Sequence, residues 1–123
     1  MLHFCWENMI NKRKYKRVPM IGTAVVKFEH RGYVTIKTTT GSISLGGIGL
    51  YSDDPIEIDT NISITISFIT ADGIKNASIK GLVKHNKKIG GIYFLGIYFS
   101  EEINPKNHPS LYEHIQNILA WDN

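Results

Sequence analysis

Cysteine, arginine and long apolar runs are all scarce in this sequence. The single cysteine, Cys5, has no internal partner for a disulfide, and such low cysteine usage is typical of a reducing compartment. No apolar run approaches the ~18 residues that a membrane-spanning helix needs. Residues 1–10 are mildly apolar, but they are too short for a signal peptide and lack its basic start. The sequence therefore predicts a cytoplasmic protein without a membrane span.

The residue types that enzymes and metal sites use are present but scattered. No histidine has metal-ligand spacing with another histidine or with Cys5. The nearby glycines Gly46, Gly47 and Gly49 fall within a β-rich segment, which argues against a Walker or Rossmann loop. We therefore expect no catalytic residues, no metal and no cofactor, and predict that the protein is not an enzyme. The scattered histidines are His3, His30, His85, His108 and His114.

The charge is modestly basic and uneven along the chain. Fourteen basic residues against eleven acidic ones give a net charge of +3. Residues 11–17 carry five positive charges and no negative one, whereas residues 53–59 carry four acids and no base. The basic run alone is also what a solvated tail would show, and it is short for a protein that binds duplex DNA. The acids around Pro55 indicate a solvated loop.

Period-2 alternation of apolar and polar residues dominates the chain from Met20 onward. The clearest case is Ile62–Phe68, where isoleucines and a phenylalanine alternate with hydroxyl residues, as in a half-buried antiparallel strand. We expect Gly41 and Ser42 to interrupt one strand, and residues 86–91 to form a polar turn. The first expected strand begins at Ala24. The others are Tyr33–Thr40, Ile43–Tyr51 with a bend or bulge at its glycines, Ile62–Phe68, Ile74–His85 and Ile92–Ser100.

The last part of the chain changes to helical spacing. Ser110 and Glu113 have the spacing of a capping box, with Ser110 as the N-cap. Apolar residues then recur at Leu111, Ile115, Ile118 and Leu119, which predicts an amphipathic helix over about 110–121. The fold class is therefore mainly β: a small six-stranded antiparallel barrel with one C-terminal helix. We expect an N-terminal arm over 1–10 and one domain over 11–123, with its barrel at about 18–100.

Two short segments stand out as a candidate binding site. The chain has only three arginines, and two of them, Arg13 and Arg17, stand four residues apart in the basic run. Arginine recognises phosphate and the edge of guanine through forked hydrogen bonds. The segment Ser42–Gly47 supplies hydroxyls and allows close backbone approach. Together these segments suggest two walls of a site for a phosphorylated guanine ligand.

These residues resemble the sequence motifs of the PilZ domain, a bacterial receptor module for cyclic di-GMP. The Arg-x-x-x-Arg motif matches Arg13 and Arg17 just ahead of the first strand, and the Asp/Asn-x-Ser-x-x-Gly motif matches at Ser44 and Gly47. Position 42 departs from that pattern, because it is Ser where the family has Asp or Asn. The resemblance covers about residues 11–120.

The resemblance implies a cyclic di-GMP receptor that signals to an unidentified protein partner in trans. It implies that Arg13 and Arg17 contact phosphates and guanine edges, while Ser42 and Ser44 donate or accept hydrogen bonds. It also implies that Gly46 and Gly47 let the backbone approach the ligand, and that the arginine segment becomes ordered over the bound nucleotide. Two alternatives stay open: a PilZ-like adaptor that binds no nucleotide, and a small barrel that binds single-stranded nucleic acid.

Overall fold

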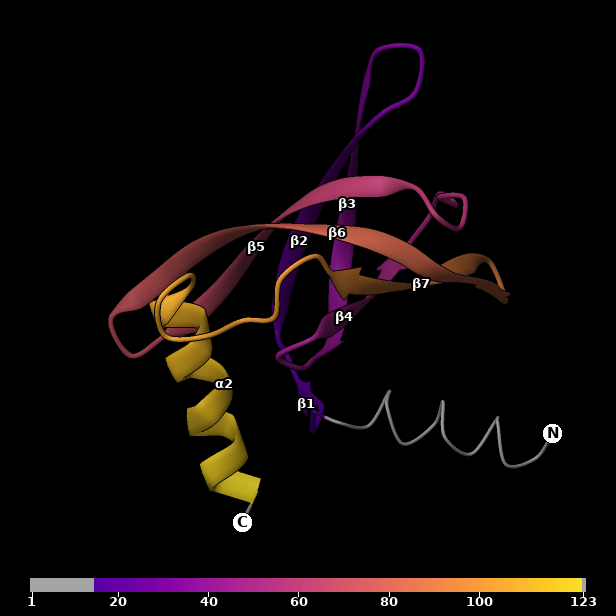
Figure 1. Cartoon of the computed structure of the whole chain (residues 1–123). Coiled ribbons are helices and arrows are strands. Elements are labelled where there is room, and N and C mark those ends of the chain that lie inside the picture. The colour runs from indigo at the N-terminus through magenta and orange to yellow at the C-terminus, as the bar shows by residue number, and fades with distance from the viewer. Residues whose placement is uncertain (1–14, 123) are drawn as a thin grey trace, which may run out of the picture.

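The computed structural model describes residues 15–122, which form seven strands and one helix (Figure 1). The β2–β3 turn projects from one end of the molecule, whereas β1 and α2 lie toward the other end (Figure 1). The elements are β1 (Val18–Pro19), β2 (Gly22–Glu29), β3 (Tyr33–Ile43), β4 (Gly47–Ser52), β5 (Asn61–Thr70), β6 (Gly73–Ile89), β7 (Ile92–Phe99) and α2 (Pro109–Asp122).

Six of the strands close into a ring through antiparallel pairing. The sheet runs in the order β3, β2, β5, β6, β7, β4, and a further pairing between β3 and β4 joins its two ends. The two-residue strand β1 adds to β3 outside this ring. The predicted fold, mainly β with a ring of six antiparallel strands and a C-terminal helix, is confirmed. A closed ring leaves few unpaired strand edges, and it encloses one core.

The alternation in the sequence decides which side chains fill that core. In β5 the residues Ile62, Ile64, Ile66 and Phe68 are all buried, as the period-2 pattern predicts. Every second residue of a strand faces the same side, so the intervening hydroxyl residues face outward. The same rule sends Thr38 of β3 inward, where its hydroxyl donates to the carbonyl oxygen of Ala24 at 2.8 Å. The buried polar group is thereby satisfied.

Two predicted strand boundaries are wrong. Gly41 and Ser42 do not interrupt β3, which continues to Ile43; a shift of register against β4 between Thr40 and Ile43 absorbs them. Such a bulge keeps a strand paired while one residue is out of step. The polar segment 86–89 also continues β6 and pairs with β7 in place of turning. Lys87 and Lys88 are exposed and Asn86 is half-buried, so this part of the β6–β7 hairpin lacks the apolar alternation from which a strand is predicted.

The helix follows the predicted pattern but starts one residue earlier. Pro109 is the first residue of α2, and the amide of Tyr112 donates to the carbonyl oxygen of His108 at 2.9 Å. Ser110 is therefore inside the helix, and its predicted role as N-cap is wrong. Proline suits the first helical position because that position needs no amide donor. Leu111 and Ile115 are buried against the barrel, as expected. Among the described residues, no helix is both long and apolar enough to span a membrane.

Candidate functional site

The short strand β1 places Arg17 beside β3. Val18 pairs with Ile43 and is completely buried, while Pro19 pairs with Ser42. These pairings hold Arg17, the residue just before β1, over the end of β3. Its Nη1 donates to Oγ of Ser42 at 3.3 Å. The structure thus brings together two of the predicted site residues that are 25 positions apart in the chain.

Arg13 lies outside the described residues, so its place in the site stays a prediction. Arg17 is exposed and Ser42 is half-buried, which leaves both side chains open to a ligand on the outer face of the barrel. The hydrogen bond between them is long, because N–H···O bonds typically measure about 2.7–3.2 Å between the heavy atoms. A guanidinium has five donors, so this bond leaves most of its donors for a ligand.

Ser44 shapes the turn between β3 and β4. Its amide donates to the carbonyl oxygen of Gly47 at 2.9 Å, and its hydroxyl accepts from the amide of Gly46 at 3.2 Å. The side chain is buried, with 6% of its surface exposed. Such a hydroxyl-to-backbone bond is a common way to fix a turn. In this state Ser44 therefore holds the loop, and it does not face the surface as Ser42 does.

Other atoms of the protein pack closely against the two glycines of this turn. A Cβ on Gly47 would lie 2.5 Å from the carbonyl oxygen of Ile97, so only glycine lets β4 approach β7 this closely. A Cβ on Gly46 would lie 2.9 Å from the ring of Tyr15. The close backbone approach that the sequence indicates is present at Gly47, but in the structure its neighbour is strand β7.

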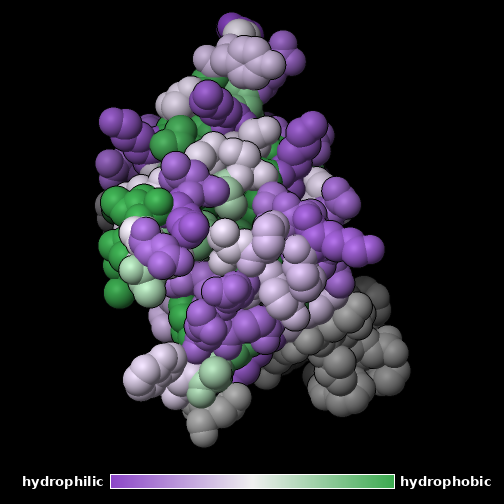
Figure 2. Space-filling view, turned by 90° about the vertical axis from the view of Figure 1, so that its left-hand side faces the viewer, coloured by the Kyte–Doolittle hydropathy of each residue, from purple (hydrophilic) through white to green (hydrophobic). Residues whose placement is uncertain are grey.

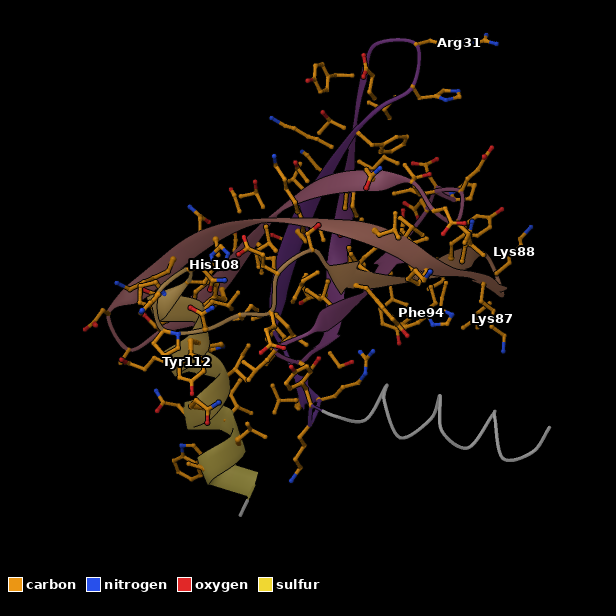
Figure 3. The ribbon with its side chains drawn as sticks, in the orientation of Figure 1. Arg31, Lys87, Lys88, Phe94, His108 and Tyr112 are labelled. Carbon is orange, nitrogen blue, oxygen red and sulfur yellow. The ribbon has the colours of Figure 1, made fainter. Side chains whose placement is uncertain are left out.

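Two aromatic side chains of this region, Phe94 near Ser42 and Tyr51 over Gly41, were not anticipated from the sequence. A Cβ on Gly49 would lie 2.9 Å from the ring of Phe94 and 3.8 Å from Oγ of Ser42, so that ring and that hydroxyl border the same glycine. The ring of Tyr51 meets Phe94 edge to face, with 5.5 Å between centroids. Figure 3 shows Phe94 and Lys87 on the same side of the β6–β7 hairpin, which agrees with their pairing across it. The sequence signal was the outward position of Phe94 in β7, but its pairing with β4 could not be read locally.

A groove of about 480 Å³ lies elsewhere, between the β5–β6 turn and α2. Ile69 and Trp121 line it and are 62% and 88% exposed, and His114 lies in the same groove. Burial lowers the pKa of His114. Figure 2 looks onto the side that carries this turn and α2 and shows hydrophobic surface bordered by hydrophilic surface. Of the predicted site residues that the structure describes, none lines this groove.

The acidic loop that the sequence indicates lies in solvent. The acids Asp53, Asp54, Glu57 and Asp59 are exposed, as expected for a solvated loop, and Asp59 pairs with Lys84 at 3.7 Å. Within residues 15–122, no three His, Cys, Asp or Glu side chains lie close enough to hold a metal ion.

Comparison with known proteins points to one family. The family model of the PilZ domain matches residues 11–121. The structure of the Bacillus subtilis inhibitor of motility, MotI/DgrA, is similar, with a TM-score of 0.70 and 17% identity over 88% of this chain. This chain spans 52% of that protein's length.

A second similar structure is the PilZ domain of YcgR from Escherichia coli with c-di-GMP. Its TM-score is 0.62 and its identity is 14%, over 90% of this chain and 94% of that one. At these identities the two structures show a shared fold. No curated protein matches the sequence. Because the family model covers nearly the whole chain, including both the Arg17 segment and the Ser42–Gly47 turn, the chain belongs to the PilZ domain family.

Proposed function

We propose that this chain is a single PilZ domain over residues 11–123 that binds cyclic di-GMP through Arg13, Arg17 and the Ser42–Gly47 turn. The observation that carries the proposal is the contact between Arg17 and Ser42 on the outer face of the barrel. Membership of the PilZ family and the similarity to a PilZ domain with c-di-GMP support it. Cyclic di-GMP has two phosphates and two guanines, so it offers both of the groups that arginine recognises by forked bonds.

Each residue has a definite role in this proposal. Arg17 donates to a phosphate oxygen or to the O6/N7 edge of guanine, and Arg13, four residues earlier in the sequence, does the same. Ser42 exchanges its bond with Arg17 for one with the ligand. Ser44 and Gly47 keep the β3–β4 turn in the shape that presents Ser42 and Gly46 to the nucleotide.

Calorimetric titration with cyclic di-GMP, GTP and a short single-stranded oligonucleotide tests the proposal. We expect micromolar binding of cyclic di-GMP alone, and a loss of at least tenfold in affinity in Arg17→Ala, because a charged hydrogen bond contributes about 1.5–3 kcal/mol. Arg31→Ala is the matched control, since Arg31 is at the β2–β3 turn at the far end of β3 and should bind normally (Figure 3).

Other titration results would favour other functions. Absence of heat with all three ligands would support the adaptor without nucleotide binding, which the serine at position 42 favours. Oligonucleotide binding that weakens steeply with salt would support a single-stranded nucleic-acid binder.

We further propose that binding is transmitted by the segment that carries the arginines. Ligand held between Arg13, Arg17 and the barrel would fix this segment against β3 and so create a new surface for a protein partner in trans. Amide hydrogen exchange tests this step: exchange in residues 10–20 should slow when cyclic di-GMP saturates the protein. Unchanged exchange in that segment, with binding intact, would contradict the switch and leave the receptor function standing.

A further inference from the structure

The outer face formed by β3, β4, β7 and β6 carries glycines that aromatic rings cover. At four glycines, a ring atom lies 2.7–2.9 Å from the position that a Cβ would take. Each ring therefore rests on the backbone of the sheet and does not extend freely into solvent. The pairs are Gly41 with Tyr51, Gly46 with Tyr15, Gly49 with Phe94, and Gly96 with His85.

The pairing of the strands makes these rings neighbours. Tyr51 is directly opposite Phe94 across β4 and β7, and Gly49 is opposite Gly96 in the next outward row. The rings of Tyr51 and Phe94 meet at 60°, and Tyr51 is 40% exposed. We call the pair Tyr51 and Phe94 the ring surface.

The ring surface is continuous with the arginine site. The ring of Phe94 and Oγ of Ser42 both lie within 3.8 Å of the position that a Cβ on Gly49 would occupy. The same Oγ of Ser42 accepts the hydrogen bond from Arg17. A ligand held by Arg17 and Ser42 would therefore lie close to the ring of Phe94, since both that ring and Ser42 border Gly49.

A flat aromatic surface beside a cation suits one kind of ligand group. Every nucleobase has a π face, and stacking of a base on an aromatic side chain is a large term in nucleic-acid binding. Forked, charge-assisted hydrogen bonds from arginine hold the edge of a base or a phosphate, but they leave the faces of the bases uncovered. An aromatic ring supplies the missing contact.

We propose that the ring surface is a further subsite of this binding site, which stacks on a purine base of the cyclic dinucleotide through Phe94, with Tyr51 buttressing that ring. The inference rests on the proposed receptor function and deepens it. Neither residue belongs to the two motifs by which the sequence resembles its family. The competing explanation is structural, since an aromatic ring that covers a glycine also stabilises a sheet. That explanation predicts a loss of stability without an effect on the ligand.

Phe94→Leu separates the two explanations, because leucine still covers Gly49 but cannot stack. We expect the dissociation constant for cyclic di-GMP to rise roughly tenfold, with a thermal unfolding midpoint close to that of the wild type. Phe94→Tyr should bind normally, because tyrosine keeps the ring. The matched control is Tyr33→Leu: Tyr33 is 84% exposed and at the other end of β3 from Ser42, roughly 30 Å away.

Nuclear magnetic resonance of the aromatic protons gives a readout that a purely structural role would not move. Saturation with cyclic di-GMP should shift the ring protons of Phe94 upfield, because a stacked purine shields them, and should leave those of Tyr33 in place. If the wild type binds cyclic di-GMP but Phe94→Leu binds equally well and the Phe94 signals do not shift, the subsite is wrong and the receptor function stands. If the wild type does not bind cyclic di-GMP, both proposals are wrong.

Discussion

Two outer regions of the same ring of strands are built differently. One is the ring surface of Tyr51 and Phe94 together with Arg17 and Ser42. The other, which we call the hydroxyl surface, lies on β2, β5 and β6, where short polar side chains pair across the strands. Oγ of Ser67 donates to Oδ1 of Asn76 at 2.7 Å, and the hydroxyls of Thr65 and Ser78 are 3.2 Å apart. The hydroxyl surface consists of Thr23, Ser63, Thr65, Ser67, Asn76 and Ser78.

The difference between the two surfaces indicates which part of the barrel is better suited to bind a ligand. Hydroxyls that bond to one another and to water already have partners, and a ligand would have to replace them at little net gain. The region around Arg17 combines one exposed guanidinium with glycines and aromatic rings. Glycine inside a strand costs stability, and it often marks a place where another group approaches closely. Several such glycines on one face therefore distinguish it from the hydroxyl surface.

Some glycines of this face lie against the backbone of a neighbouring strand, whereas others lie only against an aromatic side chain. Gly47→Ala should show the largest effect on stability, because its Cβ would lie 2.5 Å from the carbonyl oxygen of Ile97 in a neighbouring strand. We expect a loss of about 2–3 kcal/mol in the free energy of unfolding, as for other overpacked sites. Urea denaturation followed by circular dichroism measures it.

Gly91→Ala is the matched control for that substitution. Gly91 lies between β6 and β7, and a Cβ there would have no atom within 4 Å. Its free energy of unfolding should stay within about 0.5 kcal/mol of the wild type. Equal urea midpoints for the two variants would show that β4 and β7 are not as closely packed at Gly47 as we describe.

Local periodicity predicted most of the fold. The inward residues of β5 and β7, such as Ile64 and Ile97, follow from alternation, and the buried face of α2 follows from helical spacing. Periodicity failed at Gly41 and Ser42, where a bulge keeps β3 paired in spite of residues that usually end a strand. A bulge depends on the partner strand, which the local sequence does not specify.

The site was predictable only in part, for a related reason. The approach of Arg17 to Ser42 was expected from the family resemblance, and no pattern within either segment would have placed them together. Alternation within Ile92–Ser100 favours an outward position for Phe94, but its place beside Ser42 depends on the pairing of β7 with β4. Pairing between strands distant in sequence is fixed by packing of the whole core, so local residue patterns do not reveal it.

The serine at position 42 gives the finest test of the comparison between the two regions. A carboxylate reaches further than a hydroxyl and accepts two N–H donors of a guanine at once. Ser42→Asp should therefore lower the dissociation constant for cyclic di-GMP by up to about tenfold, since one added hydrogen bond contributes on the order of 1 kcal/mol. Calorimetry measures the change.

The new carboxylate also repels the phosphates of the ligand. The effect of an added negative charge on affinity therefore has to be measured separately from the effect of a direct contact. Ser67→Asp adds the same charge on the hydroxyl surface, where the ligand makes no contact in our proposal, and charges beyond a Debye length are largely screened. A gain in affinity for Ser42→Asp alone would mark position 42 as a direct contact with the base. An unchanged or weaker affinity in Ser42→Asp, with Ser67→Asp binding as tightly as the wild type, would contradict the expected gain from a direct contact at position 42.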